Sequence, residues 1–308
     1  MRKLFLAIVG VFLILIGIAG LILPILPGWL LIFLGLSFIA PEFAEKLKKR
    51  IFRKLFKHEI VTLDEWKKYP VRAGFTTRHF PLLLHKTDDL LDPSKQDQLK
   101  GLLSRYPPPG AGTVAASGGR HRGCFLNQVH GDNVVALEDP AVFEKGDFYH
   151  AKEADGVITN IKDLTLLVLT ADCLSIFFYA PGWTGLVHAG WRGTEKKIAQ
   201  KVFQMILGQS KCRPSDVQIA FGPRICKDHY EVGEEFKNLF PEKSIYTKSG
   251  KTYFDLAGEN KRQLLQAGAV PGNILDHGIC TVCENEDFYS FRKEKEAAGR
   301  MVSFIVKS

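Results

Sequence analysis

The sequence predicts an α+β domain preceded by a transmembrane helical hairpin. An uncharged run from Leu4 to Ala40 opens the chain. In the rest of the chain, short apolar runs typical of β-strands outnumber segments with helical periodicity. We therefore expect two parts: residues 1–58, a membrane hairpin with a basic amphipathic helix, and residues 59–308, a single domain long enough to bury one large core.

The uncharged run is long enough to cross a bilayer twice. It spans 37 residues, whereas one transmembrane helix needs roughly 20. Pro24, Pro27 and Gly28 lie near its middle, where proline removes a helix donor and glycine permits a sharp reversal. A single long tilted helix and a cleaved signal peptide are the alternatives, although a signal h-region has only about 7–15 residues.

Basic residues flank this run on both sides. Two precede it and seven follow within residues 46–57. The positive-inside tendency places both ends in the cytoplasm, so we expect a membrane-anchored protein whose main domain is cytoplasmic. Leu47, Ile51 and Leu55 share one helix face among these basic residues, which is typical of a helix on an anionic membrane surface. A solvated linker helix is the alternative.

The net charge of +8 belongs almost entirely to this N-terminal part. Residues 1–57 carry nine Lys or Arg against two acidic residues, and the remainder carries 32 against 31. The main domain is therefore nearly neutral, and its charge gives no reason to expect nucleic-acid binding.

Apolar patterning predicts the elements of the main domain. Strands are expected at residues 125–129, 157–159, 164–169, 176–178, 185–188, 217–220, 289–291 and 301–306. Helices are expected at residues 195–207, 233–240 and 256–267. Thr194 and Asp255 are the expected caps of the first and third of these helices.

Three residues that follow β-rich runs have the ligand chemistry of an open zinc site. They are His130 in FLNQVHG, Cys173 in LTADC and His188 in LVHAGWRG, and we call them the trio. Two imidazoles and a thiolate leave a tetrahedral Zn²⁺ one free position, where a bound water becomes a nucleophile near neutral pH. The alternative is a cysteine hydrolase in which Cys173 is the nucleophile and His188 its base. A lone histidine or thiol is more often a packed residue.

The motifs around the trio resemble those of one known family. FLNQVHG, EADGVITN, LTADC, HAGWRG, FGPRICKDHYEVG, YFDL and FYSFRKEKEAAGR occur in the order seen in the YfiH/laccase-domain (FAMIN-like) family, over about residues 70–308. The resemblance implies an α+β fold of layered sheets with flanking helices, in which residues 74–77 resemble the family's opening strand. It also implies a purine nucleoside phosphorylase that acts on adenosine, inosine and guanosine and deaminates adenosine, with the trio binding zinc and acting in catalysis.

Two further resemblances lead in other directions. An older name for the family, multicopper polyphenol oxidase, makes copper a weaker alternative to zinc, because several coppers need more histidines than the trio offers. The N-terminal stretch GLILPILPGWLLIFLGLSFIAPEFAEK resembles small bacterial PGPGW-type transmembrane proteins, with LPGW in place of PGPG. That second family suggests no chemistry.

Polar residues near the trio are candidates for substrate binding. Gly190 and Gly193 permit a tight turn in AGWRG, and Arg192 with the following helix start could hold phosphate. Arg192 could instead pair with a buried carboxylate such as Asp155. Arg78 in GFTTRHF and Arg292 in FYSFRK also match arginines of the family, and the resemblance implies that they bind substrate.

Two acids and two amides complete the candidate site. Asp155 and Asp172, in ADGV and TADC, could orient a ligand imidazole, act as a general base or cap a turn. Asn127 and Gln128 could hydrogen-bond to a purine or a ribose.

The remaining metal candidate is the pair Cys280 and Cys283. Their C-x-x-C spacing resembles half of a structural zinc site, but no second C-x-x-C or H-x-x-x-H half accompanies it, so packed thiols are favoured. A cytoplasmic placement argues against disulfides among the six cysteines.

Overall fold

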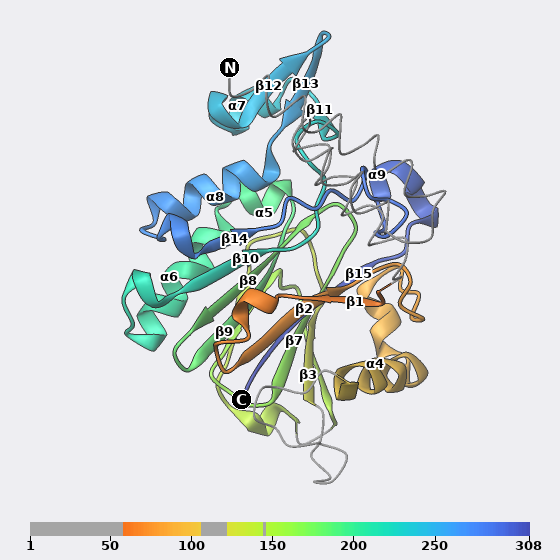
Figure 1. Ribbon diagram of the computed structural model, residues 1–308, viewed down its shortest axis with the longest axis vertical. Coiled ribbons are helices and arrows are strands. Elements are labelled where there is room, and N and C mark those ends of the chain that lie inside the picture. The colour runs from red at the N-terminus through yellow and green to blue at the C-terminus, as the bar shows by residue number, and fades with distance from the viewer. Residues whose placement is uncertain (1–57, 106–121, 144–145) are drawn as a thin grey trace, which may run out of the picture. The chain divides into compact units, whose positions relative to one another are not determined.

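The computed structural model describes residues 58–105, 122–143 and 146–308. This part contains two six-stranded sheets, one three-stranded sheet and few helices (Figure 1). The predicted α+β class is confirmed. The predicted hairpin and basic helix were assigned to residues 1–58, and residues 1–57, including the surface expected to meet an anionic membrane, lie outside the described residues.

The predicted localisation requires correction. No helix in residues 58–105, 122–143 and 146–308 combines the length and the hydrophobicity needed to cross a membrane. The longest helices there have 13 residues, whereas a spanning helix needs about 20. This finding contradicts the assignment of a membrane-anchored protein with a cytoplasmic catalytic domain, which is withdrawn.

The first large sheet joins the two ends of the described chain. Its order is β1-β2-β15-β7-β3-β5, in which β3 pairs in parallel with β5 and β7 and the other pairs are antiparallel. The strands are β1 (Ile60–Thr62), β2 (Val71–Thr76), β15 (Met301–Lys307), β7 (Leu164–Thr170), β3 (Arg122–Leu126) and β5 (Phe148–Ala151).

The second large sheet is mixed as well. Its order is β14-β10-β8-β9-β6-β4, with the two edge pairs β10–β14 and β4–β6 parallel. The strands are β14 (Ile274–Asp276), β10 (Gln218–Phe221), β8 (Leu174–Ala180), β9 (Trp183–Ala189), β6 (Gly156–Thr159) and β4 (Val134–Leu137). A small sheet consists of β11 (Glu231–Val232), β13 (Lys251–Phe254) and β12 (Ile245–Lys248).

Helices cover the outer faces of the sheets. The α-helices are α4 (Pro93–Arg105), α5 (Trp191–Glu195), α6 (Ile198–Ser210), α7 (Phe236–Leu239), α8 (Leu256–Gln266) and α9 (Phe291–Glu294). Short 3-10 helices are η1 (Asp64–Trp66), η2 (Thr87–Leu91), η4 (Pro140–Phe143), η5 (Pro214–Asp216), η6 (Glu242–Ser244), η7 (Pro271–Asn273) and η8 (Lys295–Ala297). Figure 1 shows α6 and α8 beside the second sheet and α4 beside the first.

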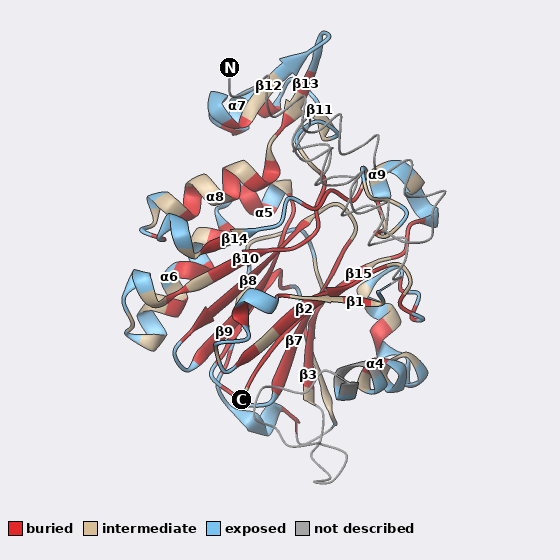
Figure 2. Ribbon diagram, viewed as in Figure 1, coloured by how far each residue is buried: buried red, intermediate tan, exposed pale blue. Residues whose placement is uncertain are grey.

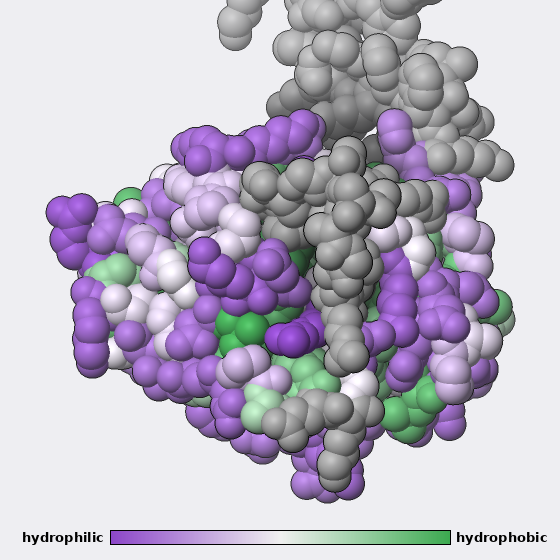
Figure 3. All heavy atoms as spheres, turned by 90° about the horizontal axis from the view of Figure 1, so that it is seen from below, coloured by the Kyte–Doolittle hydropathy of each residue, from purple (hydrophilic) through white to green (hydrophobic). Residues whose placement is uncertain are grey.

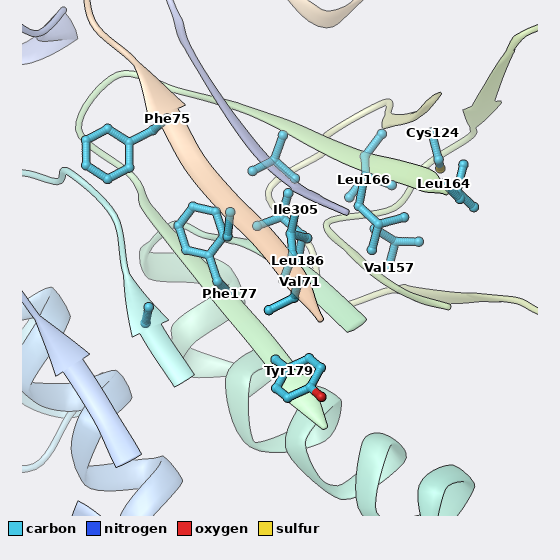
Figure 4. Close-up of a cluster of buried hydrophobic side chains, with 14 of the residues drawn as sticks. Val71, Phe75, Cys124, Val157, Leu164, Leu166, Phe177, Tyr179, Leu186 and Ile305 are labelled. Carbon is cyan, nitrogen blue, oxygen red and sulfur yellow. The ribbon is translucent and has the colours of Figure 1, made fainter. Parts of the chain in front are cut away.

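Alternating side chains of the central strands build three apolar layers. One face of β7 and one face of β8 meet between the two sheets, where Leu166, Phe177 and Leu186 lie in a common cluster (Figure 4). Side chains from the opposite face of β8 pack against α6 and α8. Because both faces are covered, all seven residues of β7, β8, β9 and β15 are buried (Figure 2). This explains why their sequences consist mostly of apolar residues.

One face of the described part of the chain is mostly hydrophilic. On the face shown in Figure 3, hydrophobic residues form small separate patches among hydrophilic ones.

Three predicted elements differ from the structure. Thr194 lies inside α5, where its hydroxyl donates to the Gly190 carbonyl at 2.8 Å and accepts from Asn260 of α8 at 2.9 Å. The helix is then interrupted at Lys197, whose φ is +60°. Residues 289–291 form no strand, because the Ser290 hydroxyl accepts from the Lys293 amide and begins α9. Residues 233–240 contain only the short helix α7.

Leu186 tests the layer between the two large sheets. It is fully buried (0% exposed) and belongs to the shared cluster. We expect Leu186→Ala to lower the free energy of unfolding by about 2–5 kcal/mol, the sum of lost burial and a residual cavity. The matched change Leu91→Ala, at a side chain that is 51% exposed, should cost less than about 1 kcal/mol. Denaturant unfolding of both variants measures the difference, and equal losses would contradict this layer.

Candidate functional site

The structure brings the trio together from three separate elements. His130 lies in the loop after β3, Cys173 in the turn between β7 and β8, and His188 near the end of β9. Their ligand atoms all lie within 4.8 Å of one another. The two imidazole rings meet nearly edge to face, with ring centres 4.8 Å apart. His188 is buried, Cys173 is half-buried and His130 is exposed, so one side of the group is open.

A buried carboxylate, Asp155, holds two members of the trio. Its Oδ1 atom lies 2.8 Å from Nδ1 of His188 and accepts the His130 amide at 3.0 Å. Its Oδ2 atom accepts the amides of Val129 at 3.2 Å and Gly131 at 2.6 Å. A carboxylate in this position fixes the proton of His188 on Nδ1 and leaves Nε2 as the nitrogen available to a metal or a proton donor.

Charge interactions within the trio favour a thiolate. Burial by itself raises the pKa of the Cys173 thiol, but the charges of and hydrogen bonds from His188 and His130 outweigh it and lower the pKa to about 6. Burial likewise disfavours the charged imidazole of His188, whereas the Cys173 thiolate and Asp155 raise its pKa to about 9. The chain therefore supplies an ionised sulfur next to two imidazoles at neutral pH.

The donor set and the surrounding space suit a metal ion. The trio is a group of histidine and cysteine ligand atoms that can hold one. Gly190 lies directly against it, because a Cβ atom at this position would stand 3.3 Å from both Cys173 Sγ and His130 Cδ2. Contacts of this length are tighter than nearly all real Cβ contacts. A side chain at position 190 would occupy the space next to the ligands.

The trio opens into a cavity of about 390 Å³. The walls come from η2, the β7–β8 turn, the loop after β10 and the segment from α9 to β15. The lining residues are His85, Lys86, Thr87, Gln128, His130, Leu169, Thr170, Ala171, Asp172, Cys173, His188, Ile225, Tyr230, Leu256, Phe291, Arg292 and Arg300. This volume lies within the range of roughly 300–1,000 Å³ that is usual for small-molecule sites.

The two predicted amide residues differ in their position relative to the cavity. Gln128 lines the cavity, but its Nε2 donates to the Leu169 carbonyl at 2.8 Å and its Oε1 accepts the Leu169 amide at 2.7 Å. Both polar ends of this side chain are therefore occupied by β7. Asn127 is not among the residues that line the cavity.

The predicted arginines lie in different places. Arg292 lines the cavity, where it donates to the Glu231 carbonyl at 2.8 Å and lies over the ring of Tyr230. Arg192 is exposed and lies over its neighbour Trp191, outside the lining. Arg78 forms an ion pair with Glu294 at 2.8 Å and is also outside the lining. Of the three, only Arg292 is placed at the cavity.

The second predicted acid, Asp172, shapes the wall of the cavity. Its φ of +91° is a left-handed conformation at the β7–β8 turn. The carboxylate accepts the Thr281 hydroxyl at 2.6 Å and the Arg292 amide at 2.6 Å. Asp172 thus holds the segments around residues 281 and 292 against the turn that carries Cys173, and Asp155 is the acid that contacts an imidazole.

Two cavity residues, Arg300 and Tyr230, were not singled out from the sequence. Arg300 donates to the carbonyls of Ala298 and Gly299 at 2.8 and 3.1 Å. Burial lowers its pKa, against the opposing charges of Cys173 and Asp172. Burial raises the pKa of Tyr230, and the Cys173 charge adds to this effect. Both lie inside quoted motifs, FYSFRKEKEAAGR and FGPRICKDHYEVG, so motif membership was the available signal.

Relatives of known name match the same region. The chain is 34% identical to a purine nucleoside phosphorylase of Deinococcus radiodurans over 186 residues, which are 58% of this chain and 68% of that protein. It is 30% identical to the purine nucleoside phosphorylase YlmD of Bacillus subtilis, over 59% of this chain and 69% of that protein. It is 31% identical to the adenosine deaminase RL5 of an unknown prokaryotic organism, over 50% of this chain and 62% of that protein.

Solved structures share the fold. Bacillus licheniformis YfiH superposes with a TM-score of 0.67 at 26% identity, covering 81% of this chain and 97% of that chain. YlmD from Geobacillus stearothermophilus gives a TM-score of 0.66 at 29% identity, covering 78% of this chain and 93% of that chain. The domain therefore has a YfiH-like α+β fold with mixed sheets.

Two family models match the chain. Residues 3–54 match the family described as "Putative transmembrane protein (PGPGW)", in agreement with the N-terminal resemblance. Residues 113–308, more than half of the chain, match the family described as "Multi-copper polyphenol oxidoreductase laccase". This chain therefore belongs to the laccase-domain family that includes YfiH, as its motifs predicted.

Proposed function

We propose that this protein is a zinc-dependent purine nucleoside phosphorylase that also deaminates adenosine. The observation that carries the proposal is the convergence of His130, Cys173 and His188 at one cavity. Relatives named purine nucleoside phosphorylase and adenosine deaminase support it. The proposed substrates are adenosine, inosine and guanosine, with inorganic phosphate as the second substrate of phosphorolysis.

The trio is the proposed zinc site and supplies the catalytic groups. Two imidazole nitrogens and a thiolate sulfur are ligands that Zn²⁺ favours, and the three leave one position open. A zinc ion held there would supply Lewis acidity and would lower the pKa of a bound water. Asp155 orients His188 through Nδ1, as metal-bound histidines usually require.

The two proposed reactions change different bonds of the nucleoside. Phosphorolysis forms a bond between a phosphate oxygen and C1′ of the ribose, breaks the bond from C1′ to the purine nitrogen and leaves a proton on the base. Deamination adds water at C6 of adenine and releases ammonia. The cavity of about 390 Å³ accommodates a small polar ligand beside the trio.

Arg292 and Arg300 are the proposed phosphate contacts. Both line the cavity, and guanidinium groups bind phosphate oxygens through paired hydrogen bonds. We assign phosphate binding to these two arginines and not to the AGWRG turn. Arg192 lies outside the cavity lining, and the helix that starts in this turn, α5, has only five residues. Arg78 also lies outside the lining and is assigned a structural role, through its ion pair with Glu294.

A cysteine hydrolase is the second candidate function. The lowered pKa of Cys173 and the chain of contacts from Cys173 through His188 to Asp155 suit a nucleophile, its base and an orienting acid. Metal removal separates the two proposals, because a hydrolase of this kind would keep its full activity after chelation. Copper-dependent polyphenol oxidation has less support, because the trio supplies ligands for a single ion.

The direct test is an incubation of the purified protein with adenosine, inosine and guanosine, with and without phosphate. We expect free base and ribose 1-phosphate only when phosphate is present, and inosine from adenosine in either condition. Chromatography identifies the products. Absence of all three products from the zinc-loaded protein would reject the proposal, and the variant His188→Ala serves as the inactive control.

Asp155→Asn tests the support of the trio. The amide would present one oxygen where the carboxylate accepts from His188 and three backbone amides. We expect zinc affinity and turnover to fall by about 10–100-fold, the usual cost of removing a partner of a metal ligand. Chelator competition measures the affinity. The matched control is Asp139→Asn, at an exposed residue. Equal effects of the two changes would refute a specific role for Asp155.

Arg300→Gln tests the phosphate contact. A hydrogen bond to a charged group contributes about 1.5–3 kcal/mol, so we expect the KM for phosphate to rise by roughly 10-fold or more. The KM for inosine and the rate of adenosine deamination should change far less. Arg192→Gln, outside the cavity lining, is the control. A phosphate KM that stays at the wild-type value would assign Arg300 to another role.

A further inference from the structure

A second group of cysteine and histidine ligands lies outside the trio. Cys226 and His229 follow β10, and Cys280 and Cys283 follow β14. The two strands pair in parallel, so their carboxyl ends reach the same edge of the sheet (Figure 1). The two following segments continue side by side through a bridge between Arg224 and Cys280. Topology therefore joins a C-x-x-H pair to the C-x-x-C pair.

The four ligand atoms converge around His229. Its Nδ1 atom lies 3.2 Å from the sulfur of Cys226, 3.8 Å from that of Cys280 and 3.5 Å from that of Cys283. All four ligand atoms lie within 4.8 Å of one another. Three sulfur atoms around one imidazole nitrogen, from two separate segments, form a compact cage.

These separations match a tetrahedral zinc site. Zinc lies about 2.3 Å from thiolate sulfur and about 2.0–2.1 Å from imidazole nitrogen, so ligand atoms at the corners of a tetrahedron stand roughly 3.6–3.8 Å apart. The three distances from His229 Nδ1, from 3.2 to 3.8 Å, lie around this value. Small side-chain movements would complete the geometry.

Hydrogen bonds prepare one sulfur for metal binding. The amides of Cys226 and Cys283 donate to Cys280 Sγ at 3.4 and 3.5 Å. Cysteine binds a metal as the thiolate, and backbone amides that donate to a sulfur favour that form.

We propose that Cys226, His229, Cys280 and Cys283 form a structural zinc site with four protein ligands. Three thiolates and one imidazole are a ligand set of closed zinc sites, and soft thiolates select Zn²⁺ over Mg²⁺ or Ca²⁺. The site differs from the trio, which offers three ligands and keeps one position open. It does not depend on the function proposed for the trio.

The proposed site would hold one wall of the cavity in place. The segment that starts at Cys226 is preceded by Ile225, whose amide donates to the Asp172 carbonyl at 2.9 Å, and is followed by Tyr230, and both flanking residues line the cavity. On the other side, the Thr281 hydroxyl donates to the Asp172 carboxylate at 2.6 Å. A metal joining the two segments would therefore fix the surroundings of the turn that carries Cys173.

Zinc content of the full-length protein tests this site. We expect the wild type, saturated with Zn²⁺ and freed of excess, to hold two zinc ions per chain by elemental analysis. Cys226→Ser combined with Cys283→Ser should lower the content to one and lower the Tm. Cys173→Ser combined with His188→Ala should also leave one, at the new site. Cys212→Ser, at another free cysteine, is the matched control and should retain two.

A measurement on the wild type keeps the proposal testable if the double variant fails to fold. Alkylation followed by peptide mass analysis should find Cys226, Cys280 and Cys283 protected in the presence of Zn²⁺ and modified after chelation. A disulfide among these three residues in the zinc-loaded protein would overturn the proposal. So would equal modification with and without Zn²⁺. Neither readout uses nucleoside activity, so a failure of this site is distinguishable from a failure of the proposed function.

Discussion

The buried carboxylate of Asp155 is the interaction on which the site depends. Asp155 directly precedes β6. Its carboxylate contacts Nδ1 of His188 on β9 and the amides of residues 129–131. The Asp155 carbonyl also accepts the His188 amide at 2.7 Å. One side chain therefore joins the loop after β3, which belongs to the first sheet, to two neighbouring strands of the second. A buried charge is tolerated there because all of its contacts are hydrogen-bond donors.

The layered sheets explain why this contact can be rigid. β7, β8 and β9 are buried along both faces, between the shared core on one side and α6 or the η2 region on the other. Close packing gives such strands little freedom to shift. Cys173 lies in the turn that joins two of these strands, and His188 lies on the third, so both are held by closely packed strands. His130 is fixed by the contact of its amide with Asp155. Loops and short helices supply the rest of the cavity.

The domain contains two cysteine and histidine groups of different design. The trio has three ligand atoms, one exposed side and an adjacent cavity. The group of Cys226, His229, Cys280 and Cys283 has four ligand atoms and lies where two parallel strands end. Asp172 connects the two groups, because its carboxylate accepts the Thr281 hydroxyl and it directly precedes Cys173 in the β7–β8 turn. This arrangement couples the stability of the outer segments to the shape of the cavity wall.

The sequence by itself determined the features that depend on local pattern and motif. It predicted the α+β class, most of the central strands, the helix begun by Asp255 and the trio, because strand periodicity and caps are read over a few residues and the motifs keep their order. Asp155 was predicted as one of two acids, and only the structure showed that it, rather than Asp172, contacts an imidazole.

Only the tertiary structure decided matters that depend on distances through space. It placed Arg292 and Arg300 at the cavity and Arg78 and Arg192 outside it, although all four lie in arginine-bearing motifs. It showed that both polar ends of the Gln128 side chain form hydrogen bonds with the backbone of β7. It also joined His229 to Cys283 across 54 positions of sequence, a contact that no local pattern contains. Parallel pairing of β10 and β14 is the physical reason, because it brings together segments that the sequence keeps far apart.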